Sequence, residues 1–277
     1  MEKYPSRKIL SILNLVFFIG TVIVNSLAMS IPINNKTTGE LSDQYPNLFV
    51  PAGSTFSIWG VIYLLLAIFA IYQLVYAFKT NEQKPTFIEK IGLLFILSSL
   101  MNMGWIFAWH YEIVSLSVLV MLVLLLSLIA IYLRLSIGRS DASGTEKYLV
   151  HLCFSIYLGW ITVATIANIT SLLVDINWNR FGLSESIWTV AVIIVAIVIA
   201  LVMLFNRKDI FYALVVDWAL YGIWIKRSEV DAEPIRSIII AVLTGMALIS
   251  LGIVTQLFRR KVYRTSVSYT HLTLPTN

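Results

Sequence analysis

The chain has 277 residues, of which 58% are hydrophobic and 13% charged, and its mean hydropathy is +0.84. A water-soluble domain carries about 25% charged residues, so this composition excludes one and indicates an integral membrane protein. The net charge of +5 is not gathered into a basic patch on a soluble fold, so nucleic acid is not an expected partner. Cys153 is the only cysteine, which excludes a disulfide within the chain and a cysteine-based metal cluster.

Apolar runs long enough for membrane helices of about 20 residues recur along the chain. The eight runs lie at about 9–31, 54–78, 89–109, 113–133, 148–170, 186–205, 210–225 and 235–257. We predict an all-α integral membrane protein with about eight transmembrane helices, the seventh being short. The first run follows basic residues, as a signal peptide would. At about 22 residues it exceeds the apolar core of a cleaved signal, so we expect a retained helix.

Lysine and arginine are distributed unevenly between the loops. If the N terminus lies in the cytoplasm, fifteen of the 20 basic residues fall on the cytoplasmic side and five on the other. The five are Lys36, Arg180, Lys226, Arg227 and Arg236. Because cytoplasmic loops retain positive charge, and because eight spans return the chain to its starting side, we expect both termini in the cytoplasm. We expect a multi-pass protein of a bacterial cytoplasmic membrane.

The longest polar connection follows the first run and covers about Pro32 to Ser54. Loops of this length in compact proteins are often functional, and this one is long enough to fold over the outer mouth of a helix bundle as a lid. A surface loop with no ligand role is the alternative.

The second run begins at Pro51 and reads PAGSTFSIWGVIY. Proline suits the first turn of a helix, because its missing N–H donor would be unpaired there. Phe56, Trp59 and Tyr63 follow at positions i, i+3 and i+7, so their rings share one helix face. This stripe is either one wall of a cavity for a flat apolar ligand or packing between helices and at the membrane interface.

The third run repeats this spacing with different chemistry. Asn102, Trp105 and Trp109 fall at i, i+3 and i+7. An amide inside a membrane helix needs a polar partner, which is either a neighbouring helix or a ligand.

The fifth run contains the segment YLGWITVATIAN. It sets Trp160 and Asn168 about two turns apart, with Ala164 and Ala167 between them. Small residues at these positions permit the close approach of a neighbouring helix or of a ligand plane.

Asp217 lies within the seventh run, FYALVVDWALYGIW, which contains no basic residue. An acid at this depth costs about 3 kcal/mol or more unless it is paired, protonated or hydrated, so a proton or ligand site is the working hypothesis. We expect Asn168, Trp218 or a water-filled cavity as its partner. Because the run is short, a re-entrant or interfacial segment is the alternative.

Two histidines, His110 and His151, lie near run ends, where an amphipathic ring tolerates the membrane interface. Neither has a second metal ligand at a suitable spacing in its own segment, so we predict no metal site.

Three of these motifs together resemble the TspO/MBR family, the translocator proteins also called tryptophan-rich sensory proteins. The motifs are PAGSTFSIWGVIY in the second run, Asn102 with Trp105 in the third, and GWITVATIAN in the fifth. They occur in the family's order, and the resemblance covers roughly residues 9–170.

The resemblance implies a five-helix bundle with a pocket that opens near the loop after the first helix. Family members bind porphyrins such as protoporphyrin IX, some bind sterols, and some bacterial members are reported to promote light-dependent porphyrin breakdown. The family's ligand-facing tryptophans correspond to Trp59 and Trp160. Tyr63, Asn102 and Trp105 match lining or motif positions.

The chain departs from the family pattern just before the second helix. The tryptophan that usually precedes a double proline is absent, because Asn47, Leu48, Phe49 and Val50 precede Pro51, and Ala52 replaces the second proline. This change points to a different ligand. The three additional spans mark an extended branch of the family.

We predict three segments along the chain. Residues 1–174 form the TspO/MBR-like five-helix domain, and residues 175–264 form a three-helix membrane extension. The end of the chain, VSYTHLTLPT, resembles the translation of a sequencing adapter, so we predict that residues 265–277 are a non-native tail.

These observations favour a membrane sensor or receptor that binds a flat hydrophobic ligand, such as a porphyrin or a sterol-like molecule, inside the helix bundle. The residues that we assign to ligand binding are Phe56, Trp59, Tyr63, Asn102, Trp105, Trp109, Trp160 and Asn168. The alternative is a transporter or permease subunit in which Asp217 is a proton or ligand site. No catalytic acid and base pair is visible, so we do not expect an enzyme, although the resemblance leaves porphyrin photodegradation open. We expect no required cofactor. A porphyrin or haem-type molecule is the expected ligand, and a homodimer is left open.

Overall fold

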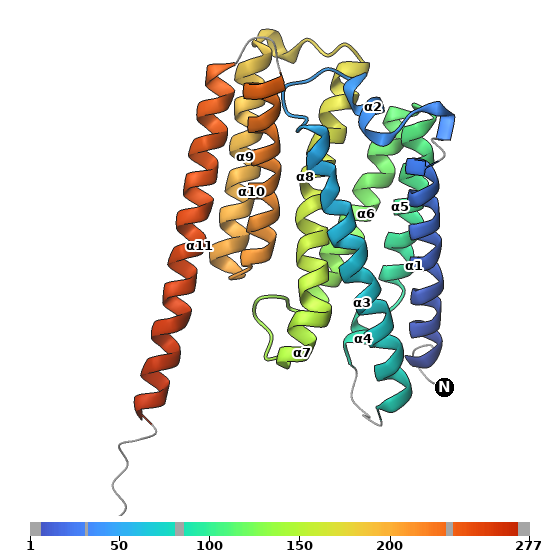
Figure 1. Ribbon diagram of the computed structural model, residues 1–277, viewed down its shortest axis with the longest axis vertical. Helices are drawn as coiled ribbons and strands as arrows, with labels where there is room; N and C mark the ends of the chain where they lie inside the picture. Colours follow the sequence, from blue (N-terminus) through green and yellow to red (C-terminus); the bar gives the residue numbers. More distant parts are fainter. Residues whose placement is uncertain (1–6, 31–32, 81–85, 231–234, 271–277) are drawn as a thin grey trace, which may run out of the picture.

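The computed structural model describes residues 7–30, 33–80, 86–230 and 235–270. Within these residues the chain is helical and contains no strand (Figure 1). The long helices are α1 (Arg7–Ser30), α3 (Ile58–Lys79), α5 (Leu94–His110), α6 (Val114–Arg134), α8 (Leu152–Asp175), α9 (Glu185–Asn206), α10 (Ile210–Ile225) and α11 (Arg236–Thr270). The predicted all-α class is confirmed, and the eight long helices correspond to the eight apolar runs.

Six segments of the described chain are long and apolar enough to cross a membrane. They are Arg7–Ser30, Gly53–Lys79, Val114–Arg134, Gly144–Asp175, Glu185–Asn206 and Arg236–Arg259. The other two helices are shorter, with 17 residues in α5 and 16 in α10. At 1.5 Å per residue α10 is about 24 Å long, less than the roughly 30 Å of a hydrocarbon core. A π-helical turn, η5 (Lys226–Val230), extends it.

The third apolar run is not a single helix, contrary to the span expected over 89–109. A short helix, α4 (Phe87–Ile91), ends at Gly92, and α5 begins two residues later. Gly92 has a φ of +55°, which glycine adopts without the strain that a side chain would add. The hydropathy pattern does not show this break, because the residues on both sides of it are apolar.

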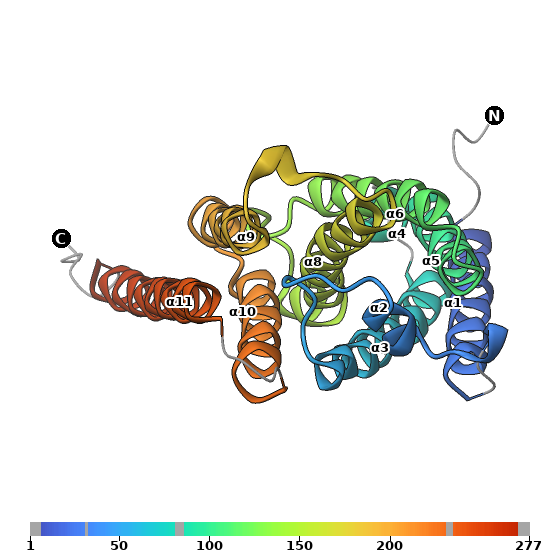
Figure 2. The ribbon, with the colours of Figure 1, turned by 90° about the horizontal axis from the view of Figure 1, so that it is seen from above.

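Five of the long helices close into a ring. Each contacts its neighbours in the order α1, α5, α6, α8, α3 and back to α1, and Figure 2 shows this arrangement from above. The rings of Phe69, Phe95 and Phe154, from α3, α5 and α8, meet at the centre with centroids 5.1 to 6.0 Å apart. These side chains are fully buried, so they form the apolar core of the bundle.

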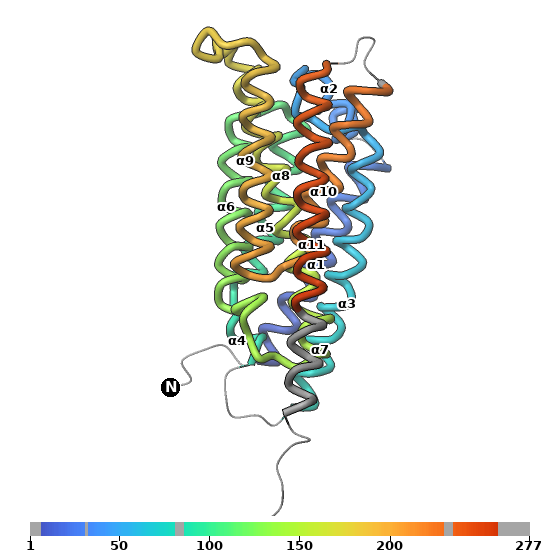
Figure 3. The backbone as a smooth tube through the Cα atoms, turned by 90° about the vertical axis from the view of Figure 1, so that its left-hand side faces the viewer, coloured from blue at the N-terminus to red at the C-terminus, as the bar shows by residue number. Residues whose placement is uncertain are grey.

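The last three helices pack against one side of this ring. The helix α10 contacts α8, α9 and α11, and Figure 3 shows α10 and α11 side by side. Gly159 permits the close approach of α8 to α10, because a Cβ at this position would stand 3.1 Å from the Cβ of Val215. The division of the chain at 174/175 remains a prediction.

The two ends of the bundle differ in charge. We call one end the basic end, because Arg7, Lys79, Lys90, Arg134 and Lys147 lie at helix termini there, together with α4 and α7 (Gly144–Glu146) (Figure 1). The opposite end, which we call the loop end, carries residues 33–57. Of the predicted non-native tail at 265–277, residues 271–277 lie outside the described residues.

Candidate functional site

A small cavity, the inner cavity, lies between α3, α5, α8 and the loop after α1. Its lining residues are Thr38, Ser42, Pro51, Phe56, Trp59, Trp105, Trp109, Trp160, Val163, Ala164, Ala167, Asn168 and Ser171. Six of the eight residues assigned to ligand binding from the sequence are among them. The structure therefore brings the motifs of the second, third and fifth runs together around one space.

Aromatic rings form the walls of the inner cavity. On α3 the ring of Trp59 stacks on that of Tyr63, with centroids 5.4 Å apart and an interplanar angle of 19°. Trp160 of α8 meets Trp59 edge to face at 6.3 Å and 85°. On α5 the rings of Trp105 and Trp109 stack at 5.8 Å and 12°. Flat, apolar surfaces from three helices are suited to a planar aromatic ligand.

Tyr63 and Asn102 do not line the inner cavity. Tyr63 lies behind Trp59 and supports its ring. Asn102 donates from Nδ2 to the hydroxyl of Tyr157 at 3.0 Å, and its Oδ1 accepts a hydrogen bond from Asn25 Nδ2 at 2.7 Å. The role of Asn102 in this structure is therefore to connect α1, α5 and α8 by hydrogen bonds.

Two polar groups on the cavity wall differ in their hydrogen bonding. Asn168 Oδ1 accepts from Trp105 Nε1 at 3.0 Å, and its Nδ2 donates to Ser117 Oγ at 2.9 Å. The amide is thus used within the protein. Trp160 Nε1, by contrast, is buried and has no hydrogen-bond partner among the described residues. An unpaired buried donor costs roughly 1–3 kcal/mol, which a ligand acceptor would recover.

The loop between α1 and α3 covers the inner cavity. Its helix α2 (Thr38–Asp43) begins with a capping box in which Thr37 and Glu40 bond each other's backbone. The Glu40 carboxylate accepts hydrogen bonds from the backbone N–H and from the hydroxyl of Thr37. Both lower the pKa of this exposed carboxyl, and the backbone bond has the larger effect. Trp109 Nε1 donates to the carbonyl of Thr38 at 3.3 Å and ties the loop to α5.

Ion pairs hold this loop at both of its sides. Lys36 Nζ lies 2.5 Å from Glu112 Oε1 at the end of α5, and Lys226 Nζ lies 2.7 Å from Asp43 Oδ1. The loop therefore lies where the lid predicted from its length would lie.

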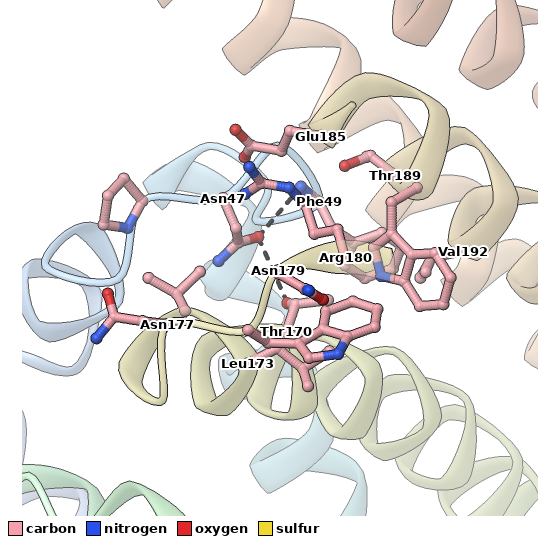
Figure 4. A pocket seen from close by; sticks show the side chains of 14 residues that line it. Asn47, Phe49, Thr170, Leu173, Asn177, Asn179, Arg180, Glu185, Thr189 and Val192 are labelled. Carbon is pink, nitrogen blue, oxygen red and sulfur yellow. Dashed lines mark hydrogen bonds between the residues drawn. The ribbon is translucent and has the colours of Figure 1, made fainter. Parts of the chain in front are cut away.

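The inner cavity is closed in this conformation. Its volume is about 40 Å³, which is far below the roughly 300–1,000 Å³ of small-molecule pockets. A larger outer cavity of about 350 Å³ lies between the loop segment Pro46–Phe49, the end of α8 and the start of α9 (Figure 4). Figure 4 shows Asn47 linked to Thr170, whose hydroxyl lies 3.4 Å from Asn47 Oδ1.

Asp217 does not have the partners that we expected. Its Oδ2 accepts a hydrogen bond from Ser250 Oγ of α11 at 3.3 Å, and Oδ1 is buried without a partner among the described residues. Trp218 instead donates from Nε1 to the carbonyl of Thr55 at 3.0 Å, and Asn168 is engaged elsewhere. Asp217 lines neither the inner nor the outer cavity.

Sequence reasoning missed a buried cluster around Asp209, which caps α10. Its carboxylate accepts hydrogen bonds from Tyr132 at 2.8 Å, from Ser155 at 2.7 Å and from the backbone of Tyr212 at 3.1 Å. The cluster joins α6, α8 and α10. The usable signal was the helix-capping position of an aspartate between two apolar runs.

The histidines are more buried than a position at the membrane interface implies. His110 is fully buried, and its Nδ1 lies 2.7 Å from the carbonyl of Ile106. His151 is 5% exposed. Among the described residues, no group of three or more His, Cys, Asp or Glu side chains is placed to hold a metal ion.

A ring of apolar helices around an aromatic cavity, closed by a loop, defines a polytopic helical membrane protein with an internal site. The model of the TSPO-like protein family matches residues 11–255, and the chain belongs to this family. The match extends well beyond residue 170 and includes α9, α10 and most of α11. No curated protein and no solved structure matches the chain significantly.

Proposed function

We propose that this protein is a membrane receptor that binds a flat hydrophobic ligand of the porphyrin type in the inner cavity. The observation that carries the proposal is the meeting of four tryptophans from three helices at one cavity, where Trp160 Nε1 is an unused donor. The rings supply apolar contact with both faces and edges of a planar molecule, and the indole N–H supplies one directed hydrogen bond. Membership in the TSPO-like family supports the same ligand class.

Ligand entry requires the loop to move, because a planar macrocycle is far larger than the closed cavity. The loop passes from the outer cavity, which Pro46, Asn47 and Phe49 line, to the inner cavity, which Pro51 lines. The side-chain link of this segment to α8 is the 3.4 Å contact between Asn47 and Thr170. We infer that displacement of this segment joins the two spaces and admits the ligand from the loop end.

The proposal is tested by titrating the purified protein with protoporphyrin IX and following tryptophan fluorescence. We expect saturable quenching. Trp160→Phe keeps a buried ring but removes the N–H donor, so it should weaken binding roughly fivefold, as expected for one hydrogen bond of about 1 kcal/mol. Trp224→Phe, on α10 and outside both cavities, is the matched control and should leave the affinity unchanged. Quenching that does not saturate, or equal effects of the two variants, would contradict the proposal.

We further propose that both termini lie in the cytoplasm of a bacterial cell. The gathering of positive charge at the basic end supports this orientation. Single cysteines introduced at Asp43 and at Asp141, in a Cys153→Ser background, report the two sides. A membrane-impermeant maleimide should label position 43 in intact cells and position 141 only after permeabilisation. The reverse pattern would invert the topology.

The second candidate function is a transporter in which Asp217 binds a proton. The specific observation in its favour is the buried Oδ1 atom, which has no partner among the described residues. Reconstituted vesicles should then show a proton flux that depends on added porphyrin and that Asp217→Asn abolishes. A flux that Asp217→Asn leaves unchanged removes this residue from any transport mechanism.

A further inference from the structure

A second, larger hollow lies at the basic end of the molecule, and we call it the basic cleft. Its volume is about 1,140 Å³. It is bounded by the π-helical turn η3 (Lys147–His151) with the start of α8, by the connection between α9 and α10, and by Gln256 and Arg259 of α11. It is separate from the inner cavity, because no residue lines both.

The basic cleft carries an excess of positive charge. Lys147, Lys208 and Arg259 line it, from three different elements. The one carboxylate in the lining is Asp209, which is 5% exposed. Three protein donors already bond its two oxygen atoms, so the carboxylate is occupied within the protein. The cleft thus presents the cations of Lys147 and Arg259 to an incoming group, and its one carboxylate is already satisfied.

His151 adds a buried polar group to the lining. The residue is 5% exposed, and its Nε2 atom has no hydrogen-bond partner among the described residues. The nearest carboxylate oxygen, Glu146 Oε1, lies 3.6 Å away, beyond hydrogen-bond distance. A ligand oxygen in the cleft would give this ring nitrogen a partner, since a neutral imidazole can carry its proton on Nε2.

The remainder of the lining is apolar and continues onto the outer surface. Leu152 and Ile210 lie in the cleft, as do Phe205 and Phe211. The two phenylalanines are 44% and 40% exposed, on helices that are long runs of apolar residues. Lipid tails would contact such exposed aromatic side chains. The cleft therefore has charged residues inside and an apolar rim that faces the lipid.

We propose that the basic cleft binds the phosphate headgroup of an anionic membrane lipid, with an acyl chain lying against Phe205 and Phe211. Phosphate oxygens suit Lys147, Arg259 and the Nε2 atom of His151, because cations and N–H donors are the usual partners of phosphate. Basic pockets between membrane helices bind anionic lipid headgroups in this way. The apolar rim distinguishes a lipid from a soluble phosphate ester, which would gain nothing from it.

Native mass spectrometry of the detergent-purified full chain tests the proposal. The protein is titrated with short-chain phosphatidylglycerol and, in parallel, with phosphatidylcholine of the same chain length. We expect saturable binding of the anionic lipid and at least tenfold weaker binding of the zwitterionic one. The variant Lys147→Gln/Arg259→Gln should weaken phosphatidylglycerol binding roughly thirtyfold, from about 1 kcal/mol per removed charge.

The matched control is Lys8→Gln/Lys79→Gln, which removes two exposed charges from the same end of the molecule but outside the cleft. It should bind phosphatidylglycerol as the wild type does. A second variant, Phe205→Ser, should weaken the lipid without changing the charge. Equal losses in the two double variants would overturn the site, because they would show a diffuse charge effect. Full displacement of the lipid by an equal concentration of glycerol phosphate would overturn the lipid assignment in favour of a soluble phosphate ester.

Discussion

At the scale of single residues, most polar side chains in the apolar helices are paired with each other. Asn102 with Tyr157 and Trp105 with Asn168 are examples across helices, and their bonds replace the water that a membrane lacks. Trp160 is an exception at the inner cavity, because its buried Nε1 has no partner among the described residues. A donor left unused in a network of satisfied groups marks the position where a ligand acceptor would be most valuable.

The Asp209 cluster predicts a specific stability effect. Asp209→Asn keeps the shape of the side chain but removes the charge that strengthens its bonds to Tyr132 and Ser155. Hydrogen bonds to charged groups contribute roughly 1.5–3 kcal/mol, so we expect a loss of about 2 kcal/mol. The melting temperature in detergent, followed by intrinsic fluorescence, should fall by roughly 5 °C. Asp141→Asn, at an exposed position, is the control, and identical melting of the two variants would refute the structural role.

At the scale of elements, the helices are rigid supports and the loop after α1 is the part that has to move. The loop is held by buried apolar side chains, among them Leu41 and Phe49, and by ion pairs at its surface. In the surface pair Lys36 and Glu112 the side chains are 34% and 38% exposed. Exposed ion pairs contribute about 0–1 kcal/mol, so such anchors can open at little cost. The same loop lines the inner cavity, which has a volume of about 40 Å³.

Locking this loop should block the ligand. The side-chain tips of Asn47 and Thr170 lie 3.4 Å apart, so the double variant Asn47→Cys/Thr170→Cys in a Cys153→Ser background should be bridged by a short bis-methanethiosulfonate reagent, which forms a reducible disulfide with each cysteine. We expect the bridged protein to take up protoporphyrin IX at least about tenfold more slowly in stopped-flow quenching, and a reductant to restore the rate. Equal rates before and after reduction would show that the ligand does not enter past this segment.

The short helix α4 predicts a pH dependence of stability. Burial raises the pKa of the Glu89 carboxyl, but hydrogen bonds from Thr86 and Arg7 outweigh it, and the pKa lies below its ordinary value of 4.5. A lowered pKa in the folded state stabilises the protein above the unfolded value, and this contribution is lost as the pH falls through the folded pKa.

The measurement is the melting temperature of the wild type and of Glu89→Gln between pH 7 and pH 3. The wild type should melt higher at neutral pH. The difference should begin to shrink below about pH 4.5 and should disappear once the pH is below the folded-state pKa of Glu89, where both proteins carry a neutral side chain. A constant difference across this range would assign the effect to packing instead of charge.

At the scale of the whole molecule, the apolar runs predicted the fold and the order of the aromatic motifs predicted which helices meet. Both signals are local, since run length and helical spacing are visible in one segment at a time. The break at Gly92 was not visible, because apolar residues continue through it. The partner of Asp217 was not predictable either, because periodicity does not show which neighbour a helix face meets, and Ser250 is on a different helix.

The inner cavity was predictable only in part. Phe56, Trp59 and Trp160 were predicted to face one space, and they do. The closed state of that space depends on the loop after α1, whose contacts with α5 and η5 join residues far apart in the chain. Only the three-dimensional structure shows that Thr38, Ser42 and Pro51 of this loop line the cavity together with the aromatic residues.

The eight tryptophans of the chain allow a direct test of where a porphyrin binds. Trp59, Trp105, Trp109 and Trp160 line the inner cavity, whereas Trp178, Trp188, Trp218 and Trp224 lie elsewhere. An illuminated porphyrin passes energy to dissolved oxygen, and the singlet oxygen formed oxidises the indole rings nearest to it. Three of the cavity tryptophans, at 105, 109 and 160, are at most 8% exposed, whereas Trp218 is 38% exposed, so oxidation by free porphyrin would reach Trp218 first.

The decisive measurement is therefore the order of tryptophan oxidation, followed by peptide mass spectrometry, in the protein illuminated with one equivalent of protoporphyrin IX. Binding in the inner cavity predicts that the four cavity tryptophans are oxidised before the other four, despite their burial. Oxidation that begins at Trp218 or at the outer cavity, and reaches Trp59 and Trp160 last, would contradict the proposed site.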